Sequence, residues 1–225
     1  MTELTKLEEI LGYSFKNKQL LEHALTHSSY ANERRNKEQS NERLEFLGDS
    51  VLSMVISRFL FDNCPGENEG SMSKNRAYIV CETSLARVAR KLSLGNYLYL
   101  GNGEDKGGGR ERDSILSDAV EAVIAAMYLD GGMEITEKWI LKALSPVIAE
   151  AAQSRMTDDF KTLLQEKYQA NGKSGIEYEV IGEEGPAHNK CFTVSVKVEG
   201  DVLGTGKGRS KKAAEQAAAR EALKI

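Results

Sequence analysis

Three acidic side chains recur at helical spacing in the segment Asn41–Ser50, which reads Asn-Glu-Arg-Leu-Glu-Phe-Leu-Gly-Asp-Ser. At about 100° per residue, Glu42, Glu45 and Asp49 fall within an arc of about 60° on one side of a helix. Three carboxylates in one stripe repel each other unless a cation lies between them. This stretch alone is equally compatible with a metal site and with a solvated acidic face.

A second segment places two carboxylates in apolar surroundings. Ile115–Leu129 is apolar nearly all round, so the helix that it predicts should be buried. Asp118 and Glu121 are three residues apart and point the same way. Two carboxylates are costly to bury unless they form ion pairs with Arg or Lys or bind a metal. The sequence leaves both alternatives open.

The two segments together offer four carboxylates that can face inward: Glu45, Asp49, Asp118 and Glu121. Carboxylate oxygens are the ligands that Mg²⁺ prefers, so we predict a magnesium site formed by these four residues. A metal held there would lower the pKa of a bound water molecule. Asp49 and Glu121 are the predicted catalytic residues, and Glu121 should be indispensable because its neighbours are the most apolar.

Both segments resemble motifs of the ribonuclease III family. Asn41–Ser50 is similar to the family signature, and Ser117–Ala122, Ser-Asp-Ala-Val-Glu-Ala, is similar to its second catalytic motif. The resemblance implies a helical endonuclease domain that cuts double-stranded RNA with Mg²⁺, for which Mn²⁺ can substitute. It also implies staggered ends carrying 5′-phosphate and 3′-hydroxyl groups. A homodimer with one site for each strand, and the processing of ribosomal RNA precursors and structured messenger RNA, are implied as well.

Three more residues acquire a candidate role through this resemblance. Phe46 matches a residue that enters a pocket on the partner subunit, although the sequence itself shows only an aromatic residue off the core face. Glu42 and Glu69 are candidate secondary acids near the site. Glu69 equally suits the start of a helix, where an acid complements the dipole.

The first 150 residues should be all helical. Apolar periodicity predicts helices over 3–12, 17–26, 41–61, 71–81, 84–92, 115–129 and 134–152. Ser71 and Thr83 are the expected N-caps of two of these helices, and Pro146 should kink or divide the last one. Residues 28–40 are expected to form a loop, and residues 96–113 a glycine-rich loop with a helix. His23 and His27 lie one turn apart and can bind metal, but a structural role is favoured.

The pattern changes after a predicted linker at residues 151–156. A helix over 157–170, three antiparallel strands near 176–180, 192–198 and 202–207, and a helix over 210–223 are expected. This order, with Gly185–His188 and Gly206–Ala214, resembles the double-stranded-RNA-binding domain. We therefore expect an all-α domain over 1–150 and a small α-β-β-β-α domain over 157–225.

The resemblance assigns RNA contacts to six residues of the second domain. Lys211 and Lys212 would attract phosphates, because the positive end of a helix dipole adds to their charge. His188 would enter the minor groove of A-form RNA. The remaining three, on the first helix, would touch 2′-hydroxyl groups: Thr162, Gln165 and Glu166. Glu215 departs from the family pattern, since many such domains carry another Lys there.

Composition sets limits on these predictions. The chain has 225 residues and a net charge of −4, so its overall charge gives no sign of nucleic-acid binding, yet Lys207–Lys224 holds six basic residues against two acidic ones. Three widely spaced cysteines indicate reduced thiols. No apolar run is long enough to cross a membrane and no signal peptide is evident, so a cytoplasmic protein is expected. A non-catalytic RNA-binding protein and a di-metal hydrolase acting on DNA are the alternative functions.

Overall fold

The computed structural model describes residues 3–34, 40–158, 160–170, 175–186 and 190–224. The chain divides into two compact units, Met1–Ala151 and Ala152–Ile225. Residues 151–156, the predicted linker, are helical here, because they lie within the helix Ser145–Asp158.

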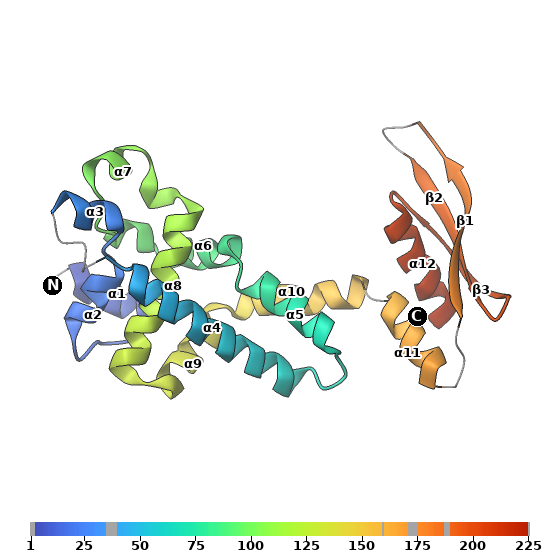
Figure 1. Cartoon of the computed structure of the whole chain (residues 1–225), viewed down its shortest axis with the longest axis horizontal. Helices are drawn as coiled ribbons and strands as arrows, with labels where there is room; N and C mark the ends of the chain where they lie inside the picture. The colour runs from blue at the N-terminus through green and yellow to red at the C-terminus, as the bar shows by residue number, and fades with distance from the viewer. Residues whose placement is uncertain (1–2, 35–39, 159, 171–174, 187–189, 225) are drawn as a thin grey trace. The chain divides into compact units, whose positions relative to one another are not determined.

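The first unit is helical, as predicted, and the second combines a sheet with helices (Figure 1). The α-helices that begin in the described part of the first unit are α1 (Glu3–Leu11), α2 (Lys18–Ala24), α3 (Ser28–Glu33), α4 (Glu42–Asn63), α5 (Glu69–Ile79), α6 (Glu82–Lys91), α7 (Asn102–Lys106), α8 (Asp113–Gly131), α9 (Met133–Ala143) and α10 (Ser145–Asp158), the last of which continues past Ala151. Two 3₁₀ turns flank α7, η2 (Leu94–Tyr97) and η3 (Gly109–Glu111).

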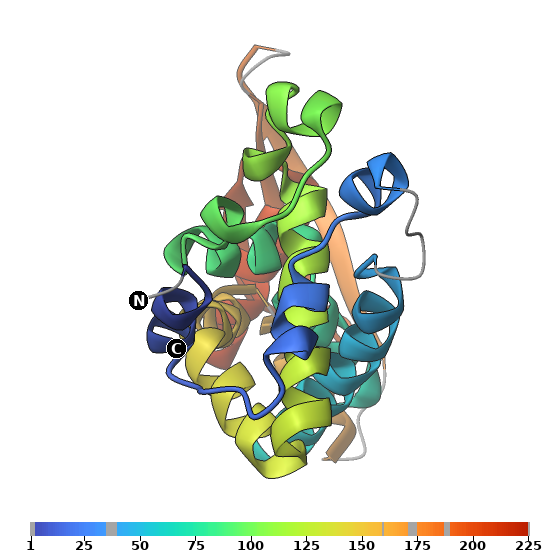
Figure 2. The same cartoon turned by 90° about the vertical axis from the view of Figure 1, so that its left-hand side faces the viewer.

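Helix α8 is the central helix of this unit. It packs against α2, α4, α6 and α9, and Figure 2 shows it running through the middle of the unit. Eleven of its residues are buried, as its nearly uniform apolar sequence predicts. Its last turn is fixed by Asp130, which accepts hydrogen bonds from Tyr13 Oη at 2.6 Å and from the backbone N–H groups of Lys16 and Asn17 at 2.9 and 2.8 Å.

Several helix boundaries differ from the prediction. Residues 28–33 form α3, although a loop was expected, and residues 35–39 of that loop lie outside the described residues. Helix α5 begins at Glu69, because Asn68 rather than Ser71 is the N-cap; Asn68 Oδ1 accepts from Ser71 N–H at 3.0 Å. Helix α6 begins at Glu82 with Cys81 at its N-cap, so Thr83 lies inside the helix.

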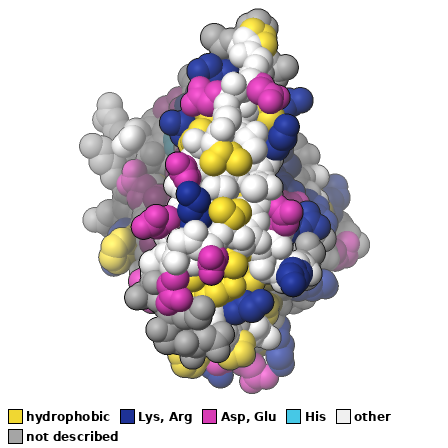
Figure 3. All heavy atoms as spheres, turned by 90° about the vertical axis from the view of Figure 1, so that its right-hand side faces the viewer, with side chains coloured by type: hydrophobic (Ala, Val, Ile, Leu, Met, Phe, Trp, Pro, Cys, Tyr) yellow, Lys and Arg dark blue, Asp and Glu magenta, His cyan; other side chains and the backbone are white. Residues whose placement is uncertain are grey.

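The second unit has a three-stranded antiparallel sheet covered by two helices. The strands β1 (Ile176–Glu184), β2 (Cys191–Val198) and β3 (Asp201–Gly208) pair in the order β1-β2-β3. Helices α11 (Phe160–Ala170) and α12 (Lys211–Leu223) pack against each other, and α12 packs on β2 and β3. Figure 3 shows one face of this unit, on which acidic and basic side chains alternate around a few apolar ones.

The contact between β3 and α12 depends on glycine. A Cβ atom at Gly204, Gly206 or Gly208 would lie 2.7, 2.1 or 2.5 Å from backbone atoms of α12. Opposite them, Ala214 and Ala218 are fully buried on the helix. The strand and the helix therefore meet almost backbone to backbone, and we call this contact the glycine–alanine seam.

No helix in the described ranges has both the length and the hydropathy needed to cross a bilayer.

Candidate active site

Helices α4 and α8 lie in close backbone contact beside the predicted acidic residues. A Cβ atom at Gly48 would lie only 1.9 Å from the carbonyl oxygen of Glu121 and 2.5 Å from its carbonyl carbon. Such distances are impossible for any side chain without movement of the backbone. Gly48 therefore allows α4 to lie directly against the turn of α8 that carries Glu121.

Three of the four predicted ligands form a cluster at this contact. Carboxylate oxygens of Glu45, Asp118 and Glu121 all lie within 4.8 Å of one another, and the three side chains are half-buried. Within the described part of the chain, no Lys or Arg forms an ion pair with any of them. Among the described residues, the three carboxylates are therefore not neutralised by ion pairs with Lys or Arg, which was the alternative to metal binding.

The electrostatics of the cluster disfavour the charged form of its carboxylates. Burial, followed by the charges of Asp49, Asp118 and Glu45, raises the pKa of Glu121 from 4.5 to about 8. Burial and the charges of Asp118, Glu42 and Asp49 raise the pKa of Glu45. A divalent cation bound to these hard oxygen ligands would relieve this repulsion, so the residues present fit such an ion.

The pKa of Asp118 is raised by burial and lowered by a hydrogen bond from Ser117 Oγ at 3.4 Å. His27 lowers this pKa further and Glu82, at the start of α6, raises it. Neither residue was predicted near the site. Both are distant from Asp118 in the sequence, and no pattern in the chain connects them with it.

The other predicted acids lie outside the three-residue cluster. Asp49 is exposed on α4 and accepts a hydrogen bond from Ser53 Oγ at 3.4 Å, although its charge acts on Glu121. Glu42 is exposed and accepts from Ser40 Oγ at 3.0 Å. Glu69 is exposed at the start of α5 and accepts from Ser73 Oγ at 2.8 Å.

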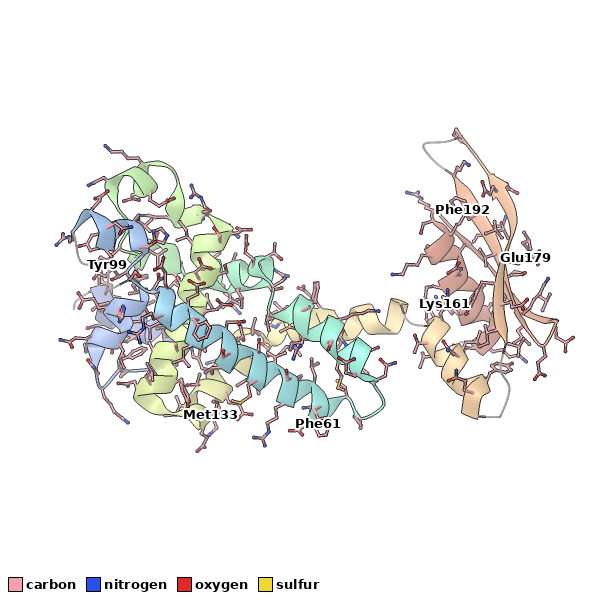
Figure 4. All side chains as sticks on the ribbon, viewed as in Figure 1. Phe61, Tyr99, Met133, Lys161, Glu179 and Phe192 are labelled. Carbon is pink, nitrogen blue, oxygen red and sulfur yellow. The ribbon has the colours of Figure 1, made fainter. Side chains whose placement is uncertain are left out.

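The two histidines have structural partners. His27 is the N-cap of α3, where its Nδ1 accepts from the Ser29 backbone N–H at 3.2 Å. His23 Nε2 lies 2.8 Å from the Ser40 carbonyl oxygen and lines a cavity of about 620 Å³ with Tyr30 and Tyr99, the latter labelled in Figure 4. Neither histidine belongs to the carboxylate cluster.

An apolar stripe lies along the exposed side of α4. Phe46 is 78% exposed, and Met54 and Phe61 are also exposed. Their spacing places them within an arc of about 80° on the helix. Phe61 is labelled in Figure 4. Phe46 therefore projects from the surface of the unit, as expected for a residue off the core face.

The predicted RNA-binding residues of the second unit lie on both helices. On α11, Thr162 is half-buried and Gln165 is exposed. Lys211 and Lys212 are exposed in the first turn of α12, where Ser210 Oγ caps the helix by accepting from Ala213 N–H at 3.1 Å. The Glu166 side chain and all of His188 lie outside the described residues.

Comparison with known proteins identifies both units. Residues 17–148 match the family model described as Ribonuclease-III-like, and residues 160–225 match the double-stranded RNA binding motif. The chain is 55% identical over 220 residues to "Ribonuclease 3" of Caldanaerobacter subterraneus subsp. tengcongensis, covering 98% of this chain and 96% of that one. It is 47% identical over 222 residues to "Ribonuclease 3" of Bacillus velezensis, covering 98% and 89%.

Solved structures agree with these matches. The nuclease domain of ribonuclease III from Campylobacter jejuni aligns with a TM-score of 0.61 and 43% identity, covering 65% of this chain and 99% of that one. A second structure of that domain gives a TM-score of 0.60 and 44% identity, covering 65% and 96%. The first of these structures concerns flexibility in a region involved in dimer formation of the Campylobacter jejuni domain.

These findings define a nuclease with a helical catalytic domain and a C-terminal double-stranded-RNA-binding domain. The chain belongs to the ribonuclease III family and is an endoribonuclease of that family. Enzymes of this family generally use a divalent metal ion, for which the carboxylate cluster is the candidate site.

Proposed function

We propose that this enzyme hydrolyses double-stranded RNA with Mg²⁺, for which Mn²⁺ can substitute. The observation that carries the proposal is the set of three half-buried carboxylates from two helices, with oxygens within 4.8 Å of one another. The double-stranded RNA binding motif over residues 160–225 supports duplex RNA as the substrate. The products would be staggered ends with 5′-phosphate and 3′-hydroxyl groups.

In this proposal Glu45, Asp118 and Glu121 hold the metal, and Asp49 completes the set from the exposed side of α4. The bound ion would supply a water of lowered pKa and neutralise charge that develops on the phosphate. Gly48 keeps the two ligand-bearing helices at the required spacing. Glu42 would add negative potential near the site without direct coordination, whereas Glu69 begins α5 beyond the other end of α4 and would not reach the cluster of its own subunit.

The second unit would supply affinity for the duplex. Lys211 and Lys212 would contact phosphates at the start of α12, while Thr162, Gln165 and Glu166 would contact 2′-hydroxyl groups and His188 the minor groove. Phosphate contacts release counterions, so binding should weaken with salt. We propose domains at 1–150 and 157–225, joined by residues 151–156.

Two copies of the chain would cut the two strands. The exposed side chain of Phe46 supports a homodimer, in which it would enter a pocket of the partner subunit. The proposed substrates are ribosomal RNA precursors and structured messenger RNA. The three cysteines are thiols rather than disulfides, which is compatible with the cytoplasm as the proposed location.

The test is a gel assay on long duplex RNA with Mg²⁺ and with EDTA, beside duplex DNA of the same sequence. We expect cleavage of RNA alone, its loss in EDTA, and binding without cleavage for Glu121→Ala. Cleavage by pure Glu121→Ala would remove Glu121 from the site. Binding without cleavage by the unmodified chain would instead favour a non-catalytic RNA-binding protein.

A further inference from the structure

Lys161, at the start of α11, contacts two other elements of the second unit (labelled in Figure 4). Its Nζ lies 2.5 Å from Glu215 Oε2 on α12 and 4.2 Å from the centroid of the Tyr178 ring on β1. Its backbone N–H donates to Gln216 Oε1 at 3.0 Å. One residue thus joins α11 to α12 through both its backbone and its side chain.

The ion pair is partly shielded from solvent. The side chains of Lys161 and Glu215 are 34% and 26% exposed, and the Tyr178 ring covers the ammonium group. The Tyr178 hydroxyl is buried without a hydrogen-bond partner among the described residues, so the ring face, rather than the hydroxyl, makes its polar contact. An ion pair held in this way keeps one geometry, unlike a mobile pair at the surface.

The pair lies beside the residues proposed to contact RNA. Thr162 follows Lys161 directly on α11, and Lys211 precedes Glu215 by one turn on α12. Duplex RNA presents its 2′-hydroxyls and phosphates at spacings fixed by the A-form helix. Both helices can make their contacts together only if the distance between them matches that spacing.

We infer that Lys161 and Glu215 are positioning residues that set the distance between α11 and α12, and thereby the preference of this domain for duplex RNA. The inference rests on the proposed function. It also explains why a carboxylate lies one turn from two phosphate-binding lysines, where its charge opposes RNA. The ion pair with Lys161 requires an acid at this position.

For Glu215→Lys, the inference predicts weaker RNA binding, whereas the change in charge alone predicts tighter binding. Glu215→Lys replaces a negative charge by a positive one near the phosphate-binding turn, a net change of two units that by itself would tighten RNA binding. If Glu215 positions the helices, the same change places two ammonium groups together and separates α11 from α12. We therefore expect binding of duplex RNA to weaken by about tenfold, the loss of roughly one good contact.

The matched control is Glu177→Lys. Glu177 is exposed and precedes Tyr178 on β1, so strand alternation places it on the sheet face opposite the helices. This variant has the same change in charge and should bind RNA as tightly as the unmodified chain or more tightly. Affinities of the full chain are measured in EDTA, for duplex RNA and duplex DNA of one sequence.

The RNA-to-DNA affinity ratio separates positioning from charge. We expect Glu215→Lys to lower this ratio, whereas Glu177→Lys should leave it unchanged. Tighter RNA binding by Glu215→Lys, with an unchanged ratio, would overturn the inference. If the unmodified chain did not prefer duplex RNA to duplex DNA, the proposed function itself would be wrong. This outcome is distinct from an unchanged ratio in Glu215→Lys, which would overturn only the inference.

Milder variants keep the test decisive if Glu215→Lys does not fold. Lys161→Arg retains a cation beside the carboxylate and the ring, and should keep both affinity and ratio. Lys161→Gln and Glu215→Gln should each lower the ratio, and the double variant should lower it no further. If the effects of the two single variants on the ratio add up in the double variant, the two residues act independently. That result would overturn the inference that they act as a pair.

Discussion

Glu121 lies where three unfavourable influences on its charge meet. Its carboxylate is half-buried, faces two other half-buried acids, and has no basic partner among the described residues. The resulting pKa of about 8 means that without metal it holds a proton at neutral pH. Ionisation of an acid with such a raised pKa destabilises the folded protein, and ligand binding accounts for the presence of Glu121 at this position.

The first prediction concerns metal and pH. Between the ordinary pKa of 4.5 and the folded value of about 8, the folded protein holds a proton that the unfolded chain releases, so the stability of the metal-free protein should fall as pH rises.

Mg²⁺ must displace this proton from Glu121 in order to bind. We expect Mg²⁺ to raise the melting temperature more at about pH 9 than at about pH 6, measured by thermal unfolding. Glu121→Gln should lose most of this pH dependence, and an equal shift at both pH values would contradict the prediction.

At the scale of elements, the separation of α4 and α8 at Gly48 determines whether the ligands can converge. The second prediction is that Gly48→Ala forces these helices apart, because the added carbon would overlap the Glu121 backbone. A shift of about 1 Å can cost about a hundredfold in rate, so cleavage should fall at least that far. RNA binding, which depends on the other unit, should persist.

The matched control is Gly103→Ala on α7, where a Cβ atom would meet nothing within 4 Å. This helical glycine should tolerate alanine with unchanged cleavage, measured in the same assay on duplex RNA. Full activity of Gly48→Ala would show that the α4–α8 contact can relax without loss of the site.

The long periodic elements could be predicted from sequence, because α4, α8 and β2 bury continuous apolar faces. Their ends could not, since neighbouring polar residues compete as caps: Asn68 caps α5 although Ser71 was expected. Helix α3 has six residues, too few for apolar periodicity to appear.

The candidate site shows the same division. Two acidic stripes at helical spacing predict that carboxylates of two helices face inward, and the structure places Glu45, Asp118 and Glu121 together. The pattern does not specify how far Asp49 lies from them, because that depends on the α4–α8 crossing. The effects of His27 and Glu82 on Asp118 arise only from tertiary contacts.

At the scale of the whole molecule, the apolar stripe of α4 bears on assembly. Burial of a phenylalanine contributes about 1.5–3 kcal/mol, so removal of Phe46 should raise the dimer dissociation constant at least about tenfold. The third prediction is that Phe46→Asp shifts the protein toward monomer, measured by sedimentation. Val202→Asp, at an exposed apolar residue of the other unit, should leave the assembly unchanged. A dimer of undiminished stability in Phe46→Asp would place the interface elsewhere.

The glycine–alanine seam of the second unit limits which amino-acid substitutions this chain can accept during evolution. Glycine is the smallest residue, so every substitution at Gly204, Gly206 or Gly208 adds atoms that would overlap the backbone of α12. A large core residue such as Leu164 can be replaced by a smaller one and compensated by a neighbour, but these glycines have no smaller replacement. We therefore expect these three glycines of β3 to resist substitution, while the exposed positions between them accept other residues.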